Sequence, residues 1–152
     1  MNLTDAVRNA RRVYLCGNGG SAANAIHIAN DLISVGVKAH ALTADVATLT
    51  AIANDFGYMQ VFSRQINLFG EPGDLLIALS GSGTSANILE ALRAALDKGM
   101  DAILIKGTFG DAKAAPNAWP TVIETGDTMQ RAEEQQLILG HDVMLTIKRG
   151  LK

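Results

Sequence analysis

Two glycine-rich loops, each placed between a short apolar run and a helical pattern, constrain the fold of this 152-residue chain more than any other feature. The first loop is CGNGGSA at residues 16–22, and the second is SGSGTSA at residues 80–86. A strand that ends in such a loop and continues into a helix is the repeating unit of parallel α/β sheets. The loop also gathers bare N–H groups and the positive end of a helix dipole at one point, which suits an anion.

Five short runs rich in Val, Ile, Leu and Ala predict strands buried on both faces of a parallel sheet, because they lack polar alternation. They lie at residues 12–16, 38–43, 74–80, 101–106 and 121–124. Stretches with helical spacing lie at residues 21–35, 45–54, 61–69, 84–99 and 128–151, and residues 107–119 are expected to form an irregular loop. We therefore expect a single α/β domain over residues 1–152, with a doubly wound five-stranded parallel sheet and helices on both faces.

Composition argues against several classes of partner. The net charge is −2 and no cluster of Lys and Arg forms a basic stripe, so we expect no nucleic acid. No apolar stretch approaches the roughly 20 residues of a membrane span and no signal-peptide pattern is present, so we expect a cytoplasmic protein without a membrane partner. The single cysteine, Cys16, lies in an apolar strand pattern and is expected to be a buried structural thiol.

Both loops are expected at the carboxyl ends of their strands, where open α/β sheets bind ligands near the point at which the strand order reverses. If the first and third strands are neighbours, the two loops face one crevice. The second loop adds short neutral hydrogen-bond donors that can surround a phosphomonoester, namely Ser80, Ser82, Thr84 and Ser85. The pair of loops therefore indicates a small phosphorylated ligand.

The first loop also matches the dinucleotide fingerprint G-x-G-x-x-A through Gly17, Gly19 and Ala22. That fingerprint requires an acidic residue about 20 positions further on, at the end of the second strand, but residues 41–43 there are Ala, Leu and Thr. Asp45 follows too late and fits the N-cap of the next helix better. Neither loop ends in Gly-Lys-Ser/Thr, which excludes a Walker A loop. The alternative is that both loops are tight turns that bind no ligand.

Two histidines and two acidic residues form a second candidate set. His27 and Asp31 are four residues apart on one predicted helix, so their side chains share a face. Glu133 and His141 are two turns apart on the last predicted helix. Imidazoles and carboxylates can bind Zn²⁺ or act as acid and base near neutral pH. Spacing alone equally allows His27 and Asp31 to be a capping or surface pair, and Glu133 to lie on a solvated helix face.

Five segments, in order along the chain, resemble the sugar isomerase (SIS) domain family, and within it the bacterial phosphoheptose isomerases. They are LCGNGGS at residues 15–21, ANDFG at 53–57, GDLL at 73–76, SGSGTSAN at 80–87 and KGM at 98–100. The second segment holds Asn54 and Asp55, which by position alone fit either a C-terminal helix turn or a contact to sugar hydroxyls. The resemblance implies the SIS fold, a flavodoxin-like doubly wound sheet, and a homotetramer with active sites between subunits.

The resemblance further implies isomerisation of sedoheptulose 7-phosphate to D-glycero-D-manno-heptose 7-phosphate through an enediolate, with one Zn²⁺ per subunit. His27, Asp31, Glu133 and His141 match the family's zinc ligands, with Asp31 as the expected base and His141 as the expected acid, or the reverse. The residues that match the family's substrate site are Asn18, Gly19, Gly20, Ser21, Asn54, Asp55, Ser80, Gly81, Ser82, Ser85 and Glu133.

The chain departs from the family's pattern at two of these positions. Asp31 stands where the family normally has Glu, so its carboxylate is one methylene shorter, and Glu133 stands where the family normally has Gln, which adds a negative charge. Only residues 1–10 precede the first predicted strand, and we expect the helix that the family places there to be missing. Two other functions stay open: an isomerase of another ketose phosphate, and a non-catalytic SIS module that senses a phosphosugar or docks to a protein.

Overall fold

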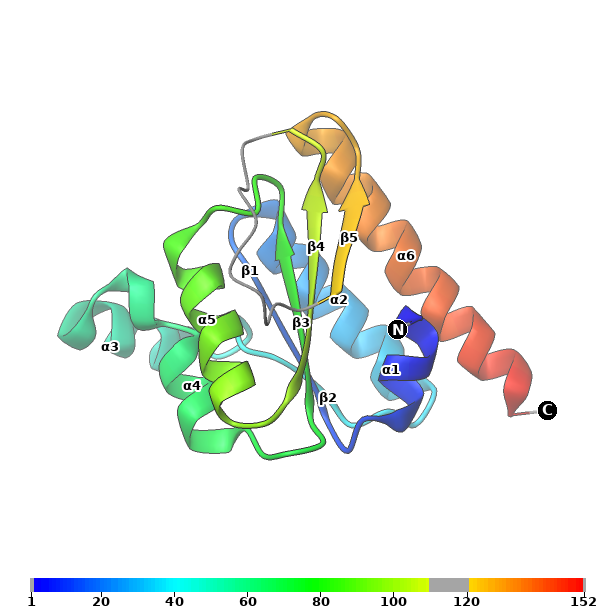
Figure 1. Cartoon of the computed structure of the whole chain (residues 1–152), viewed down its shortest axis with the longest axis horizontal. Coiled ribbons are helices and arrows are strands. Elements are labelled where there is room, and N and C mark those ends of the chain that lie inside the picture. Colours follow the sequence, from blue (N-terminus) through cyan, green and yellow to red (C-terminus); the bar gives the residue numbers. More distant parts are fainter. Residues whose placement is uncertain (1, 110–120, 152) are drawn as a thin grey trace.

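A five-stranded parallel sheet forms the centre of the computed structural model, which describes residues 2–109 and 121–151 (Figure 1). Its strands are β1 (Val13–Gly17), β2 (Ala39–Ala41), β3 (Leu75–Ser80), β4 (Asp101–Gly107) and β5 (Thr121–Thr125). The order across the sheet is β2-β1-β3-β4-β5, the doubly wound flavodoxin-like order, which reverses between β1 and β3. The predicted sheet is confirmed, and β1 and β3 are neighbours, as a shared crevice requires.

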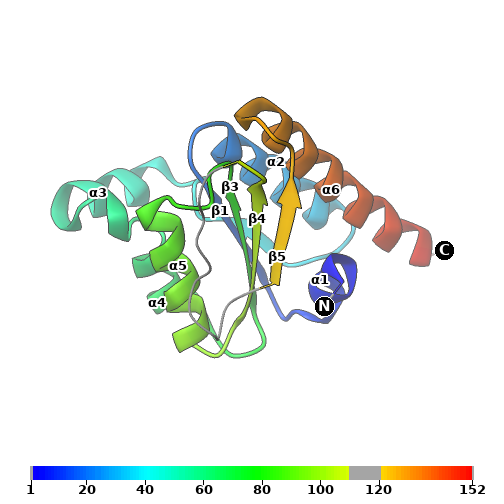
Figure 2. The same ribbon diagram turned by 45° about the horizontal axis from the view of Figure 1, so that its top comes forward.

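Helices cover both faces of the sheet. They are α1 (Leu3–Asn9), α2 (Gly20–Ser34), α3 (Val46–Phe56), α4 (Ser63–Phe69), α5 (Ala86–Asp97) and α6 (Met129–Gly150), with one 3₁₀ turn, η1 (Tyr58–Gln60). In Figures 1 and 2, α1, α2 and α6 lie on one face and α4 and α5 on the other, while α3 stands off to the side. The result is the predicted α/β sandwich.

Strand residues alternate between two apolar cores, because successive side chains of a strand point to opposite faces. Leu15 and Ile77 pack with α1, α2 and α6, whereas Cys16 and Ala78 pack with α4 and α5. Both faces are therefore apolar, which explains why the strands show no polar alternation in the sequence. Cys16 is fully buried, as predicted for a structural thiol, and burial raises the pKa of that thiol far above its ordinary value.

A short helix, α1, precedes β1 and is not among the helical stretches predicted from the sequence. The Asn2 side chain accepts a hydrogen bond from the Thr4 N–H at 2.9 Å and so caps the helix. Ala6 and Val7 are buried in the core that α2 and α6 also cover. Two helical turns are unstable alone, so α1 forms because of this packing.

Asp45 caps α3, as its position predicts. Its carboxylate accepts hydrogen bonds from the N–H groups of Ala47 and Thr48 at 3.0 and 3.2 Å, and from the Thr48 hydroxyl at 2.6 Å. These bonds, that of the Thr48 hydroxyl first, lower the pKa of Asp45. A carboxylate committed to a helix cap is not positioned to bind a ribose, which agrees with the rejection of a dinucleotide site.

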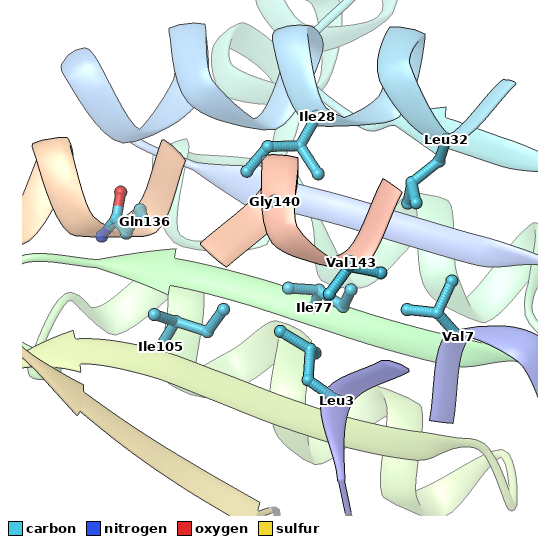
Figure 3. A pocket seen from close by; sticks show the side chains of 9 residues that line it. All are labelled: Leu3, Val7, Ile28, Leu32, Ile77, Ile105, Gln136, Gly140 and Val143. Carbon is cyan, nitrogen blue, oxygen red and sulfur yellow. The ribbon is translucent and has the colours of Figure 1, made fainter. Parts of the chain in front are cut away.

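A small cavity of about 10 Å³ lies in the core between α1, α2, α6 and the sheet. Figure 3 shows its lining, in which Gln136 is the one polar side chain among apolar residues. A space of this size holds about one water molecule at most. The cavity is therefore not a sugar site.

The carboxyl end of β4 leads into the irregular loop predicted at residues 107–119, most of which lies outside the described residues. Gly107, its first residue, belongs to β4. In residues 2–109 and 121–151, no helix is long and apolar enough to cross a membrane.

Candidate functional site

The first glycine loop ends at the N-terminus of α2, where Gly20 lies against the carboxylate of Glu133 from α6. A Cβ built on Gly20 would overlap the carboxylate oxygens of Glu133, so any other residue there would displace this flexible side chain. The N–H groups at a helix start carry partial positive charge, which favours an anionic side chain there. Two predicted substrate residues that are distant in sequence are thus brought into contact.

Hydrogen bonds within the second glycine loop hold its hydroxyl groups at the N-terminus of α5. The Ser80 hydroxyl accepts a bond from the Gly83 N–H at 3.0 Å, and the Ser82 hydroxyl accepts one from the Thr84 N–H at 3.2 Å. The Thr84 hydroxyl donates to Ser82 Oγ at 3.1 Å. Ser85 is the N-cap of α5, and its side chain makes no capping bond in the described part of the chain. The first N–H groups of α5 are therefore available to an anion.

Asn18 links the two loops. Its side chain exchanges two hydrogen bonds with that of Asn87 on α5, from Asn18 Nδ2 to Asn87 Oδ1 at 2.9 Å and from Asn87 Nδ2 to Asn18 Oδ1 at 2.8 Å. The Tyr58 hydroxyl donates a third bond to Asn18 Oδ1 at 3.0 Å. Asn87 is buried, and a buried amide is costly without hydrogen-bond partners. The reciprocal pair therefore fixes the first loop against the start of α5.

A pocket opens between the two loops, at the carboxyl ends of β1 and β3. It is lined by Asn18, Ser21, Leu79, Ser80, Gly81, Ser82, Ser85 and Met129. Six of the predicted substrate-binding residues meet here, as the adjacency of β1 and β3 leads one to expect. Among the described residues, none of the lining side chains is charged. To a phosphate group the described lining therefore presents hydroxyl groups, an amide and a helix N-terminus.

Behind the pocket, hydrogen bonds tie the start of α2 to α6. Ser21 Oγ donates to Gln136 Oε1 at 3.1 Å, and Asn24 Nδ2 donates to the same oxygen at 3.2 Å. Asn24 Nδ2 also donates to the backbone oxygen of Glu133 at 2.8 Å. These bonds fix the relative position of the two helices along the stretch that leads from the pocket to the histidines.

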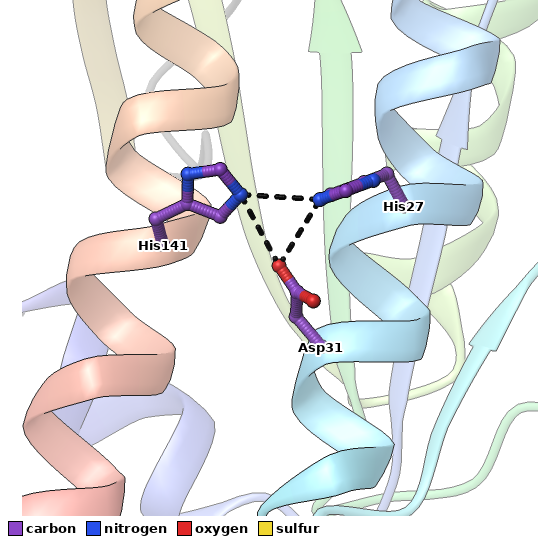
Figure 4. A group of neighbouring side chains, drawn as sticks. All are labelled: His27, Asp31 and His141. Atoms are coloured by element: carbon purple, nitrogen blue, oxygen red, sulfur yellow. Dashed lines mark hydrogen bonds and ion pairs between the residues drawn. The ribbon is translucent and has the colours of Figure 1, made fainter.

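His27, Asp31 and His141 meet at the seam between α2 and α6 (Figure 4). His27 Nε2 lies 3.1 Å from His141 Nε2, and Asp31 Oδ2 lies 3.3 Å from His27 Nε2 and 3.4 Å from His141 Nε2. The helices approach closely at Gly140, where a Cβ would stand 2.5 Å from Ile28 Cγ1. Because His141 follows Gly140 and His27 precedes Ile28, this approach brings the imidazoles together.

The three donor atoms fit a zinc ion. Zinc bonds of about 2.0–2.2 Å at tetrahedral angles place neighbouring donor atoms roughly 3.3 Å apart. The three separations, 3.1, 3.3 and 3.4 Å, match that spacing. Asp31 Oδ2 is buried and makes no hydrogen bond among the described residues, although both imidazoles lie close to it. Two imidazoles and one carboxylate are a donor set of catalytic zinc centres that keep a fourth position open.

Solvent reaches this group of side chains. The side chains of His27 and His141 are 51% and 41% exposed, and that of Asp31 is 17% exposed. His27 follows Gly20 by seven residues, which corresponds to about 10 Å along the helix axis. A ligand held between the loops by one end can therefore extend along α2 toward the histidines.

Three predicted site residues lie apart from these groups. The carboxylate of Glu133 is turned toward Gly20, and Glu133 does not join Asp31 and the two imidazoles. Asn54 and Asp55 are exposed at the end of α3, where Asn54 Nδ2 donates to Asp55 Oδ1 at 2.8 Å. Neither of these two lines the pocket between the loops.

Reasoning from the sequence missed three residues that support the site: Asn87, Gln136 and Tyr58. Gln136 does have a signal, because it occupies the buried stripe of α6, where a polar side chain must find partners. The sequence holds no such signal for Asn87 and Tyr58, because their partner Asn18 is distant in sequence and the contact depends on the fold.

Comparisons with known proteins agree with the fold. The SIS domain family model matches residues 1–107. A phosphoheptose isomerase of Thiobacillus denitrificans is 44% identical over 118 residues, which cover 74% of this chain and 60% of that protein. One from a Roseiflexus species is 37% identical over 155 residues, which cover 98% of this chain and 78% of that protein. The chain thus spans less than two thirds of the length of the first of these relatives.

A solved structure shows the same architecture. The phosphoheptose isomerase of Neisseria gonorrhoeae superposes with a TM-score of 0.85 at 34% identity, covering 97% of this chain and 81% of that one. The similarity therefore extends over nearly the whole chain, including the helices on both faces of the sheet.

Proposed function

Because the chain belongs to the SIS domain family, we propose that it is an aldose–ketose isomerase that interconverts sedoheptulose 7-phosphate and D-glycero-D-manno-heptose 7-phosphate. One observation carries the proposal: a hydroxyl-lined pocket and the group His27, Asp31 and His141 lie about two helical turns apart along α2. The pocket suits a phosphate, and the group suits the reacting carbons. We further propose that residues 1–152 form one SIS domain.

The substrate assignment is supported by the relatives, which are phosphoheptose isomerases by name. In this assignment Ser80, Ser82 and Ser85 hold the phosphate, with the N-terminus of α5 behind them. Asn18 and Ser21 line the path of the sugar, and the residues at the first loop that continue this path are Gly19, Gly20 and Glu133.

The reaction moves a proton between neighbouring carbons through an enediolate. Asp31, as the base, takes a proton from C1 of the ketose, and the electrons of that C–H bond form the C1=C2 double bond while O2 gains negative charge. His141, as the acid, donates a proton to O2. Asp31 then returns its proton to C2 and His141 takes the proton from O1, which forms the aldehyde at C1 and restores both residues.

Zn²⁺, one per subunit, is the proposed cofactor, with His27, Asp31 and His141 as its ligands. When bound, it would polarise the carbonyl and stabilise the charge on O2. Asp31 Oδ2 faces the imidazoles, so Oδ1 is the oxygen that accepts the substrate proton. Glu133 stays a predicted fourth ligand, which requires its side chain to turn from Gly20 toward His141; in its observed position it suits a sugar hydroxyl.

We also propose a homo-oligomer, with the tetramer of the family as the expected state. The helices that carry the histidines also expose apolar side chains seven residues apart, namely Ile26, Ile33, Ile138 and Leu145. Apolar stripes of this kind favour burial against another protein surface. In such an oligomer, Asn54 and Asp55 would contact the sugar bound by a neighbouring copy, because α3 extends away from the rest of its own chain.

Ser82→Ala is expected to weaken binding of the phosphosugar about tenfold, because loss of a hydrogen bond to a charged group costs roughly 1–3 kcal/mol. The chemistry lies two helical turns away, so KM should rise while kcat changes little. Calorimetric titration with sedoheptulose 7-phosphate measures the affinity. Thr50→Ala, which removes an exposed hydroxyl on α3, is the matched control. Equal affinities for Ser82→Ala, the control and the wild type would contradict the phosphate assignment.

Two alternatives make different predictions for the same assay. A sensor module would bind phosphosugars without converting them, although such a module has little use for His27, Asp31 and His141. An isomerase of another ketose phosphate is favoured by Asp31 and Glu133, which depart from the family's pattern. Incubation with a panel of ketose phosphates, followed by NMR, separates the three: conversion of sedoheptulose 7-phosphate supports the proposal, and conversion of another ketose or of none refutes it.

A further inference from the structure

In the proposed function the pocket between the glycine loops holds a phosphate, yet the side chains that line it in residues 2–109 and 121–151 carry no charge. A phosphomonoester carries a charge of about −1.5 to −2 at pH 7. The N-terminus of a helix supplies the equivalent of roughly half a positive charge. A site for such an anion therefore calls for a cation close behind its hydroxyl groups.

Lys106, the last residue but one of β4, is a buried cation with no role in the reaction described above. Its Nζ forms an ion pair with Glu124 Oε1 at 2.9 Å and donates to the Gly107 carbonyl oxygen at 3.1 Å. Lysine is almost never buried unless it is paired, because removing an ammonium group from water is costly. The ion pair with Glu124 offsets this cost and keeps a positive charge inside the protein.

Strand pairing places Lys106 beside Ser80, the first residue of the second loop. The two are register partners in the parallel pair β3–β4, so their side chains leave the same face of the sheet on strands about 4.8 Å apart. The Gly107 N–H donates to the Gly81 carbonyl oxygen at 2.9 Å, and the Thr125 hydroxyl donates to the Lys106 carbonyl oxygen at 2.8 Å. The backbone of Lys106 is thus fixed where the second loop begins.

Solvent screens the two charges of the Lys106–Glu124 pair unequally. The Glu124 side chain is 59% exposed and the Lys106 side chain 9% exposed. Water reduces the field of an exposed charge far more than that of a buried one. The pair therefore presents a net positive potential toward the protein, on the side where Ser80 and the loop lie.

We propose that Lys106 is a positioning residue for the phosphate: without touching the ligand, its buried ammonium group supplies the positive potential that draws a phosphomonoester to Ser80 and Ser82. The ligand class that benefits is a dianion, because the stabilisation scales with the charge that the ligand brings. A neutral sugar gains nothing from it.

Lys106→Met and Glu124→Gln separate this electrostatic role from a structural one. Both break the same ion pair, but the first removes a positive charge and the second a negative one. In titrations of the full chain with inorganic phosphate at low ionic strength, Lys106→Met is expected to weaken binding about tenfold and Glu124→Gln to strengthen it about twofold. Lys106→Arg keeps the charge and is expected to bind like the wild type. Melting temperatures of all variants record any loss of the fold.

Weakened binding in both Lys106→Met and Glu124→Gln, or unchanged binding in both, overturns the role of Lys106. Should Lys106→Met fail to fold, Glu124→Gln still decides, since only the electrostatic role predicts tighter binding there. A wild type that binds neither inorganic phosphate nor a phosphosugar refutes the proposed phosphate site itself. If the wild type binds phosphate and the variants bind it with the same affinity, only the proposed role of Lys106 is refuted.

Discussion

Replacing His141 by Ala is expected to lower turnover of sedoheptulose 7-phosphate by about 10²–10⁴-fold, the usual contribution of a positioned acid or base. His141 Nε2 lies 3.4 Å from Asp31 Oδ2 and 3.1 Å from His27 Nε2. In the proposed mechanism the substitution removes both the proton donor and one ligand of the metal. Affinity for the phosphosugar should change little, because His141 does not line the pocket between the loops. NMR rates and calorimetric titration measure the two quantities separately.

His40→Ala is the matched control, because His40 is an exposed histidine on β2 that is not part of the group His27, Asp31 and His141. It should leave turnover unchanged. Full turnover in His141→Ala would refute the acid assignment.

Asp31→Asn distinguishes the two possible assignments of base and acid. If Asp31 is the base, this variant loses exchange of the C1 proton with solvent, whereas a base at His141 would let that exchange continue.

Zinc is expected to stabilise the metal-free protein strongly. A ligand at 1,000 times its dissociation constant adds about 4 kcal/mol to the free energy of unfolding, which corresponds to a rise in melting temperature of roughly 10 °C for a domain of this size. A bound ion would give the buried Asp31 Oδ2 a partner, since this oxygen makes no hydrogen bond among the described residues. Thermal unfolding with and without Zn²⁺ measures the effect, with no need for substrate or turnover.

His27→Ala removes one of the three ligands and should abolish most of this shift, whereas His40→Ala should keep it. Mg²⁺ should give a much smaller shift, because it prefers oxygen ligands to imidazole. An equal shift in His27→Ala and the wild type would place the zinc elsewhere. No shift at all would mean that the two imidazoles and Asp31 form only a hydrogen-bonded surface group.

The strands could be predicted because their signals are local: each is a short apolar run that turn residues bound. The strand β2 is shorter than predicted: it covers Ala39–Ala41 within the predicted residues 38–43. It ends early because the chain turns there, and the Ala44 N–H donates to the Ala41 carbonyl oxygen. The helix α1 could not be predicted from its own residues, since two turns give little periodicity and its stability comes from packing.

The site could be predicted only as far as its parts are local. The two loops and the pair His27 and Asp31 follow from spacing, and their meeting at one edge follows from the strand order. The contact between His27 and His141 depends on how closely α2 approaches α6, which Gly140 permits and no local pattern reports. The position of Glu133 against Gly20 is set in the same way.

Exchange of substrate protons with solvent tests the central claim most directly. The zinc-supplemented protein is incubated with sedoheptulose 7-phosphate in deuterium oxide and followed by NMR. An enediolate isomerase with Asp31 and His141 in the proposed roles predicts deuterium at C1 of the ketose and at C2 of the aldose that forms. Binding of the phosphosugar with neither deuterium incorporation nor aldose formation would contradict the account and identify the chain as a phosphosugar-binding module.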